Sequence, residues 1–163
     1  TALACNDDFS GLQSQVELTL GPGTYYVVVD GYSSSSYGSY TLNVSGSSGG
    51  CGSDGTISVP GTASGSTSGR TDSYTPSCAS SYAGDAVYEM TVSSAATITI
   101  DTIGSSYDTV LYVLDSSCAT EVACNDDYSG LQSQVSTYVA AGTYYIVVDG
   151  FSSSTGSFVL DVY

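Results

Sequence analysis

The sequence contains no histidine and no lysine, and Arg70 is its only basic side chain. These absences exclude a Ser-His-Asp triad, a Cys-His pair and a Ser-Lys dyad, because each needs a base that this chain lacks. The composition does not exclude a pair of glycosidase carboxylates. Glutamate is scarce, however, since the chain has only three, at positions 17, 89 and 121, and the repeated segments described below do not share them. We therefore expect a protein that is not an enzyme.

Basic charge is scarce, and acidic charge is not. Sixteen carboxylates against one arginine give a net charge of -15, so nucleic acids and anionic membrane surfaces would repel the chain. No apolar run reaches membrane-spanning length, so we expect no membrane insertion. Tryptophan is absent, whereas tyrosine, serine, threonine and glycine are abundant, a composition typical of a secreted all-β protein.

One stretch of the sequence occurs twice. Residues 1–44 return as residues 120–162, with about two-thirds of the aligned positions identical and an offset of about 119. We read 51–163 as one complete unit, 1–44 as the C-terminal part of a second, and 45–50 as a Gly/Ser linker. Part of a sandwich leaves an apolar face in water, so we expect neighbouring repeats or copies of the same protein to complete it.

The local pattern predicts strands and no helix. Runs rich in β-branched and aromatic residues predict strands at 86–92, 96–101, 109–115, 134–140, 143–149 and 157–163, with weaker ones at 55–59 and 71–75. Gly21–Gly31 repeats the motif of the nearly continuous apolar strand at 143–149, which is typical of a central strand. Eight or nine strands predict an antiparallel β-sandwich, one whole unit plus the back part of a second.

Five cysteines favour an oxidising compartment. Cys118 and Cys124 flank a short segment, so we predict that they close a local loop and that Cys51 pairs with Cys78. Cys5 corresponds to Cys124 and then has no mate, which predicts an unpaired or intermolecular thiol. On this pairing its mate would align two positions before Thr1.

The order of several motifs identifies a family. GDAVYEMTV, ATITIDTIGSSYDTVLYVLD, ACNDDYSGLQSQV and AAGTYYIVVDGFSSSTGSFVLDV succeed one another within 51–163. This succession resembles the bacterial pre-peptidase C-terminal (PPC) domain, and 1–44 matches the back part of it again. The resemblance implies a jelly-roll-like β-sandwich, usually an accessory module of secreted proteases or a repeat in cell-surface proteins, without catalysis.

Clustered aspartates form the candidate metal site. Asn125, Asp126 and Asp127 follow a short predicted strand, Asp108 precedes another, and Asn6, Asp7 and Asp8 are the second copy. Hard oxygens on adjacent loop ends can bind Ca²⁺. The simpler interpretation is that these side chains cap turn amides, because the spacing lacks an EF-hand's alternating ligands and glutamate.

Aromatic residues and serines mark candidate glycan sites. An aromatic platform for sugars could form from tyrosines 25, 26, 32, 37, 40, 144 and 145, with Phe151, although packing in the core and on the sheet surface is the simpler role. The sequon at Asn43 and the Ser tracts are candidate glycosylation sites.

Two classes of function are compatible with these patterns. The first, which the repetition favours, is a structural repeat of an extracellular filament, stalk or adhesin shaft. The second is an accessory module that attaches a secreted protein to a polysaccharide or protein matrix. Both imply a secreted, extracellular or cell-surface protein that needs no cofactor beyond a candidate Ca²⁺.

Overall fold

The computed structural model describes residues 2–18, 25–44 and 50–163, and the chain divides into two compact units. Unit 1 is Thr1–Ser47 and unit 2 is Ser48–Tyr163. The linker expected at 45–50 lies outside the described residues except for Gly50. The described ranges contain no helix, and hence none long and apolar enough to cross a membrane.

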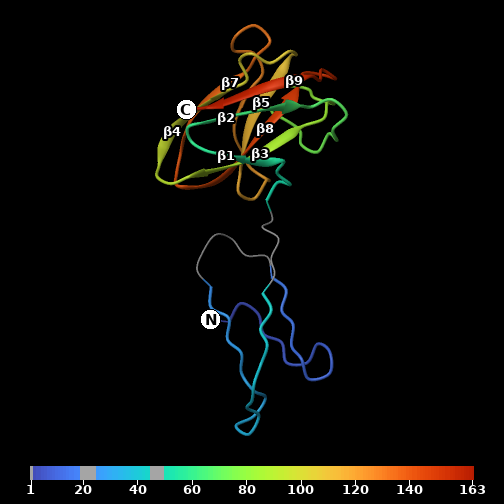
Figure 1. The fold of residues 1–163 in the computed structure, drawn as a ribbon, viewed down its shortest axis with the longest axis vertical. Coiled ribbons are helices and arrows are strands. Elements are labelled where there is room, and N and C mark those ends of the chain that lie inside the picture. Colours follow the sequence, from blue (N-terminus) through green and yellow to red (C-terminus); the bar gives the residue numbers. More distant parts are fainter. Residues whose placement is uncertain (1, 19–24, 45–49) are drawn as a thin grey trace. The chain divides into compact units, whose positions relative to one another are not determined.

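Unit 2 is a sandwich of two β-sheets (Figure 1). One sheet has five strands in the order β1-β3-β8-β5-β6, and the other has four in the order β2-β9-β4-β7. The strands are β1 (Gly55–Ile57), β2 (Gly61–Ser66), β3 (Ala86–Val92), β4 (Ala96–Asp101), β5 (Thr109–Asp115), β6 (Glu121–Asn125), β7 (Gln134–Val139), β8 (Gly142–Gly150) and β9 (Ser157–Val162). The predicted all-β sandwich is confirmed.

The pairing departs from a purely antiparallel arrangement at one edge. β1 runs parallel to β3, with Gly55 opposite Tyr88 and Ile57 opposite Met90, whereas every other pair of strands is antiparallel. The connection from β1 to β3 crosses between the sheets through β2, which pairs with β9, and this crossover permits the parallel pairing.

The five-stranded sheet is buried on both faces. Successive side chains of a strand point to opposite sides, and in β5 all residues from Thr109 to Leu114 are buried. One face packs on the four-stranded sheet and forms the main core. The other face carries a second cluster around Tyr112, Tyr145 and Val147, against which Tyr74 and Ala79 pack. Segment 67–85 covers this outer face, so β5 and β8 are buried on both sides, which accounts for their nearly continuous apolar sequences.

The disulfides hold this outer layer, and their pairing corrects the sequence prediction. Cys51 bonds to Cys118, and Cys78 bonds to Cys124. Cys118 lies in the β5–β6 turn, whereas Cys124 lies three residues beyond Glu121 in β6, about 10 Å along the strand at ~3.3 Å per residue. That separation is too long for a disulfide, so the predicted Cys118–Cys124 loop does not form.

The strand predictions were correct for the apolar runs and wrong for the polar ones. Residues 71–75 form no strand, because the backbone N–H groups of Ser73 and Tyr74 donate to the Asp85 carboxylate instead of to a neighbouring strand. β2 was not predicted, and β6 was expected only as a short strand before Asn125, without bounds. β2 is a Gly/Ser-rich edge strand in which Gly65 makes room for Phe158, since a Cβ there would lie 2.8 Å from Cζ of the ring.

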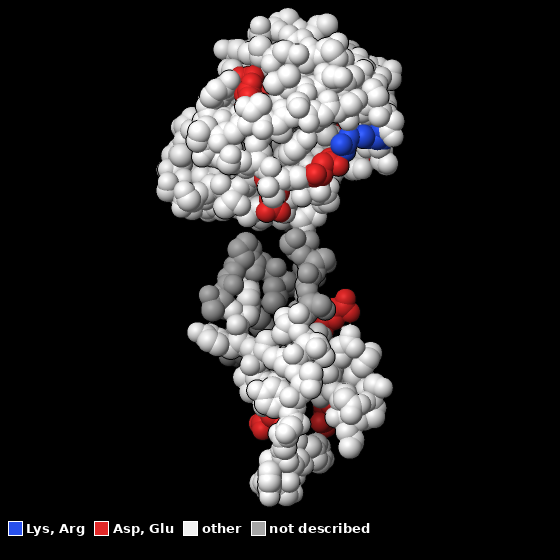
Figure 2. Space-filling model, viewed as in Figure 1, with Lys and Arg blue, Asp and Glu red and all other residues white. Residues whose placement is uncertain are grey.

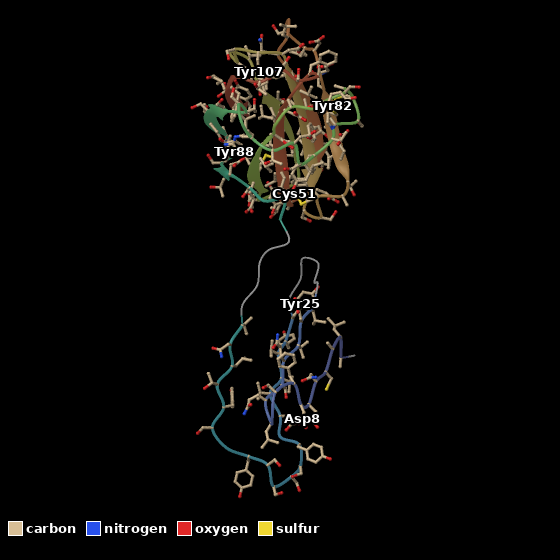
Figure 3. The ribbon with its side chains drawn as sticks, turned by 90° about the vertical axis from the view of Figure 1, so that its right-hand side faces the viewer. Asp8, Tyr25, Cys51, Tyr82, Tyr88 and Tyr107 are labelled. Carbon is tan, nitrogen blue, oxygen red and sulfur yellow. A yellow bond between two sulfur atoms is a disulfide. The ribbon has the colours of Figure 1, made fainter. Side chains whose placement is uncertain are left out.

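Unit 1 has local turns without sheets. Its described residues contain one isolated bridge, Ser10 with Gln13, and no strand. The predicted motif at Gly21–Gly31 is described from Tyr25 onward, and no strand is assigned to its described residues. Figure 3 shows the contrast between crowded side chains in unit 2 and separated ones along the ribbon of unit 1.

Candidate functional site

Three aspartates meet at one end of the sandwich in unit 2. Asp108 directly precedes β5, and Asp126 and Asp127 directly follow β6. Because β5 and β6 are antiparallel neighbours, the start of β5 and the end of β6 lie at the same end of the sheet. One carboxylate oxygen of each aspartate lies within 4.8 Å of the others, and the described residues hold no other such group of three metal-ligating side chains.

Two of these carboxylates have oxygens without partners. Oδ1 of Asp108 and Oδ1 of Asp126 are buried, and neither accepts a hydrogen bond. Burial raises the pKa of Asp108 and of Asp126, and the charge of Asp127 raises both further. Such orphaned oxygens are destabilising unless a proton or a cation meets them. Three hard carboxylates on loop ends are the donor set that Ca²⁺ prefers, so the residues present fit this ion.

A buried hydroxyl network fixes the backbone beneath the cluster. Thr102, Thr109 and Ser133 are fully buried, and Oγ1 of Thr102 lies 2.7 Å from Oγ1 of Thr109. The Ser133 hydroxyl donates to the backbone carbonyl oxygens of Thr109 and Asp126. The network joins the ends of β4, β5, β6 and β7. It therefore fixes the position of the loop that carries Asp126.

Asn125 is a turn cap in this structure. Its Oδ1 accepts a hydrogen bond from the backbone N–H of Gln134 at 3.1 Å, as the simpler interpretation of the sequence predicted. The capping interpretation therefore applies to Asn125, and the metal interpretation applies to the three aspartates. Asn125 organises the loop, and the three aspartates beside it face one another.

The second copy of the motif reproduces the cap without the cluster. Asn6 Oδ1 accepts from the backbone N–H of Gln15 at 3.2 Å, and the Ser14 hydroxyl donates to the backbone carbonyl of Asp7. Asp7 and Asp8 belong to no group of three ligating side chains among the described residues, which contain no counterpart of Asp108 in unit 1. Of the predicted ligands, the structure therefore brings together only Asp108, Asp126 and Asp127.

Sequence reasoning did not identify a buried carboxylate network on the outer face of the five-stranded sheet. Asp149 is fully buried and accepts hydrogen bonds from the Ser81 hydroxyl at 2.6 Å and the Tyr112 hydroxyl at 3.3 Å. Burial raises the pKa of Asp149 to about 6, although its hydrogen bonds oppose this. The DG dipeptide at the end of a buried strand was the available signal, but the sequence does not indicate which segment covers it.

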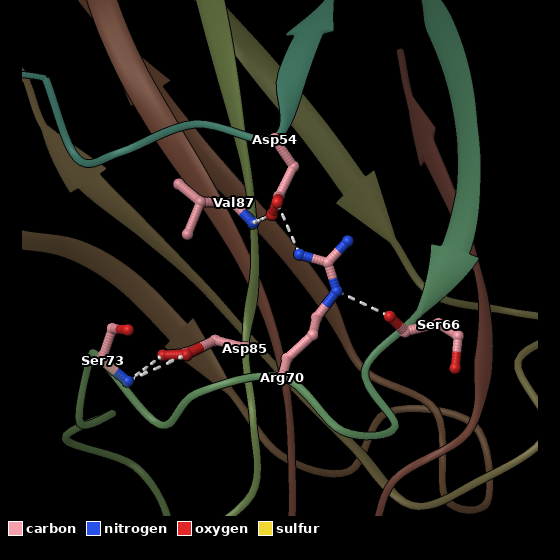
Figure 4. A network of polar contacts seen from close by, with 6 residues as sticks. All are labelled: Asp54, Ser66, Arg70, Ser73, Asp85 and Val87. Atoms are coloured by element: carbon pink, nitrogen blue, oxygen red, sulfur yellow. Dashed lines mark hydrogen bonds and ion pairs between the residues drawn. The ribbon is translucent and has the colours of Figure 1, made fainter.

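Arg70 also has a structural role within unit 2. Its Nη1 lies 2.5 Å from Oδ1 of Asp54, and its Nε donates to the backbone carbonyl of Ser66 at 2.7 Å (Figure 4). Burial raises the pKa of Asp54, but the hydrogen bonds from Arg70 and Val87 and the charge of Arg70 outweigh it and lower the net pKa. Figure 2 shows Arg70 beside acidic side chains on the surface.

The pocket next to this ion pair is lined by two carboxylates that accept backbone hydrogen bonds. It has a volume of about 380 Å³ and is lined by Asp54, Arg70, Tyr74 and Asp85, among others. Asp54 and Asp85 both accept backbone N–H groups, from Val87 and from Ser73 and Tyr74. These contacts tie segment 67–85 to β1 and β3.

The candidate sugar-binding aromatic residues and the candidate glycosylation site differ in burial between the two units. Tyr145 is buried and Tyr144 is partly buried against the core, so the packing interpretation holds there. Phe151 is partly exposed, and the candidate tyrosines of unit 1 are exposed, as is Asn43. Ser45 of the sequon lies outside the described residues.

Comparison with known proteins finds a family model that matches part of unit 2. Residues 84–150 match the model of the bacterial pre-peptidase C-terminal domain. The PPC domain of a collagenase from Bacillus anthracis is similar in structure, with a TM-score of 0.51 and 18% identity over 68% of this chain and 96% of that one.

The structure of PliG, a periplasmic inhibitor of g-type lysozyme from Aeromonas hydrophila, also aligns, with a TM-score of 0.39 and 16% identity over 66% of this chain and 97% of that one. A search of curated proteins found no match. The family match over residues 84–150 and the shared fold confirm the resemblance of unit 2 to the bacterial pre-peptidase C-terminal domain.

Proposed function

We propose that this chain is a non-catalytic structural repeat of an extracellular filament, stalk or adhesin shaft. The observation that carries the proposal is the contrast between the two copies of one strand motif. Val147 and Val148 are fully buried at the centre of unit 2, whereas their counterparts Val28 and Val29 are 82% and 47% exposed. An apolar strand that is repeated but uncovered favours association with further repeats.

The secreted setting of the proposal rests on two features. Two disulfides pin the outer layer of unit 2, and disulfides persist in oxidising compartments. The bacterial PPC domain, which the chain matches, is a module of secreted proteins and is itself non-catalytic. Bridging 67 and 46 residues, each disulfide contributes about 4 kcal/mol in the chain-entropy description, which suits a durable extracellular part.

The test compares chain 1–163 with 51–163 by light scattering and negative-stain electron microscopy. We expect 51–163 to be a stable monomer and 1–163 to form higher oligomers or extended assemblies. A monomeric, monodisperse 1–163 whose residues 1–44 resist chymotrypsin would contradict the proposal, because unit 1 would then need no partner.

We also propose that Asp108, Asp126 and Asp127 bind Ca²⁺ and stiffen the loop end of unit 2. The two orphaned carboxylate oxygens support this. A cation bound only by the native state at 100 times its Kd would stabilise 51–163 by about 2.7 kcal/mol. Melting is measured in EGTA and in millimolar CaCl₂, with MgCl₂ as the ion control.

The matched variants are Asp126→Asn with Asp127→Asn in unit 2, and Asp7→Asn with Asp8→Asn in unit 1. We expect the first pair to abolish the Ca²⁺ shift and the second pair to retain it. An identical melting curve with and without Ca²⁺ in the unsubstituted protein would show that these aspartates serve the loop alone.

A matrix-binding module is the second candidate function. Three exposed aromatic residues, Tyr82, Tyr128 and Phe151, lie at the loop end that carries the aspartates, since Tyr82 donates its backbone N–H to Ser152 and Phe151 donates its own to Asp108. Aromatic faces beside a cation site are suited to sugars. A glycan array with 51–163 and a Tyr82→Ala variant tests this, and uniform absence of binding would leave the structural role.

A further inference from the structure

We propose that Cys5 forms a disulfide with the Cys78 position of a further front half, a segment equivalent to Cys51–Ala119, that completes unit 1. The inference rests on the proposed function, because it names the segment that covers unit 1 and the covalent bond that secures it. It also differs from the sequence-based pairing, which placed the mate of Cys5 at the Cys118 position.

The first step is the equivalence of Cys5 and Cys124. Both precede the same Asn-Asp-Asp turn, and in both copies the asparagine caps a backbone N–H nine residues later. In both copies a serine hydroxyl also donates to the carbonyl of the first aspartate. The local structure that presents the thiol is therefore the same, yet Cys124 is bonded to Cys78 whereas Cys5 is free and exposed.

The second step is the location of the mate. Cys78 lies on segment 67–85, which covers the outer face of the five-stranded sheet, and Cys124 lies on β6 at the edge of that sheet. Cys118 is engaged by Cys51. A front half that covered unit 1 in the same way would place its own Cys78 position against Cys5 and its Cys118 position against its own Cys51.

The third step is the fit of the remaining surface. Residues 25–29 read Tyr-Tyr-Val-Val-Val, and the matching 144–148 read Tyr-Tyr-Ile-Val-Val. In unit 2 these residues pair with β3 and β5, so a front half provides the neighbours that Tyr26, Val28 and Val29 lack in unit 1. Asp30 matches Asp149, whose partners Ser81 and Tyr112 both belong to the front half.

The fourth step is a difference between the copies that makes the disulfide more important in unit 1. In unit 2, Glu121 accepts hydrogen bonds from the backbone N–H and the hydroxyl of Ser77, next to Cys78. The matching residue of unit 1 is Ala2, which has no acceptor on its side chain. The disulfide of unit 1 would then hold segment 67–85 to the start of the back half without the two hydrogen bonds that Glu121 accepts in unit 2.

The front half in this proposal is additional to the one in unit 2. These 163 residues contain two back halves and one front half, and that front half is already paired with β8 and β6. Swapping among copies of this chain would therefore uncover one back half for each one that it covered. A further front half of the same repeat would give each back half its own front half.

The bond requires an oxidant. Two thiols lose two protons and two electrons to form one disulfide, and oxidised glutathione accepts them and becomes two molecules of reduced glutathione. The thiol of Cys5 is exposed, so both the oxidant and the partner thiol can reach it.

The experiment adds a front half to the full chain. Residues 51–119 are fused directly before Thr1 of 1–163, which reproduces the junction between Ala119 and Thr120 because Thr1 matches Thr120. The fusion is refolded in a glutathione buffer, mapped without reduction and titrated for free thiols. We expect a Cys5–Cys78 peptide beside the Cys124–Cys78 peptide, and loss of the one free thiol that 1–163 carries.

A matched variant separates the disulfide from the completion of the fold. In the fusion with the added Cys78→Ser, we expect one free thiol per chain, while Tyr25 and Tyr26 stay protected from chymotrypsin. In the fusion that keeps the added Cys78, protection of unit 1 with Cys5 free, or with Cys5 bonded to the added Cys118, would overturn the inference and leave the proposed function standing. Unprotected tyrosines in both fusions would overturn the two together.

Discussion

The two copies of one sequence motif have the same local structure and opposite environments. Tyr145 and Val147 of β8 are 3% and 0% exposed, whereas the matching Tyr26 and Val28 are 89% and 82% exposed. The residues differ little, so the difference comes from their neighbours. β8 lies between β3 and β5, which residues 86–115 supply, and unit 1 has no such strands among its described residues. A central strand is thus defined by its partners as much as by its own sequence.

The turns behave differently, because their hydrogen bonds are local. Gly31 and Gly150 each follow an aspartate whose Oδ1 accepts the glycine's own N–H. In both copies a Cβ on that glycine would overlap a carbonyl oxygen four or five residues later, that of Ser36 or Ser154. Turn geometry therefore forms in unit 1 without the sheet that normally flanks it.

The largest expected difference between the copies is in hydrogen exchange. The amides of Val147 and Val148 are bonded within the centre of a sheet and should exchange only through global unfolding of unit 2, whereas those of Val28 and Val29 should exchange almost freely. We expect at least ~10³-fold slower exchange in unit 2. Mass spectrometry of peptides from each motif measures this, and equal protection would mean that unit 1 is folded in solution.

The second expected difference is in the response to pH. Asp149 has a folded-state pKa of about 6 against 3.8 for the ordinary carboxyl, so the folded state binds the proton more tightly. The free energy of unfolding of 51–163 should therefore rise as pH falls through about 6 and level off near 4, by about 3 kcal/mol.

Asp149→Asn should remove most of this rise, since the asparagine does not titrate. A smaller rise should remain, because burial also raises the pKa of Asp85, Asp108 and Asp126. In 1–163, Asp30→Asn should leave the pH dependence unchanged. Urea unfolding between pH 4 and pH 8 provides the measurement, and an Asp149→Asn protein with the full rise would contradict this role for Asp149.

The third expected difference concerns packing. Val147→Ala should lower the free energy of unfolding of unit 2 by about 2–3 kcal/mol, because a fully buried side chain leaves both apolar surface and a cavity. Val28→Ala should change it by less than about 0.5 kcal/mol, since Val28 is exposed. Chemical denaturation of the two variants of 1–163 tests the pair, and equal effects would place Val28 in a core.

The sequence predicted what depends on apolar pattern and failed where polar contacts decide. The runs at 86–92, 96–101 and 109–115 became strands with the predicted bounds, because each has a strand pattern of apolar residues and pairs with other strands of unit 2. The disulfide pairing could not be predicted from the sequence, because it depends on how segment 67–85 crosses the sheet. The hydrogen bonds of Asp85 and Ser81 that position this segment join residues that are far apart in sequence or that follow no apolar pattern. Asp108 lies beside Asp126 and Asp127 because strand order brings those loop ends together, and their binding of a cation stays a prediction.

The smallest expected difference tests the asparagine caps. Asn125→Ala removes the acceptor of the Gln134 N–H at the start of β7, where the loop is partly buried, so we expect a loss of about 1 kcal/mol in the free energy of unfolding of unit 2. Asn6→Ala removes the same local bond to Gln15 in an exposed loop, where water replaces the acceptor, so the unfolding of unit 2 should not change. In the fusion that completes unit 1, however, Asn6→Ala should acquire a cost close to that of Asn125→Ala, because the loop then lies against a sheet. Equal, negligible effects of both substitutions in the fusion would mean that the cap is dispensable for the folded unit.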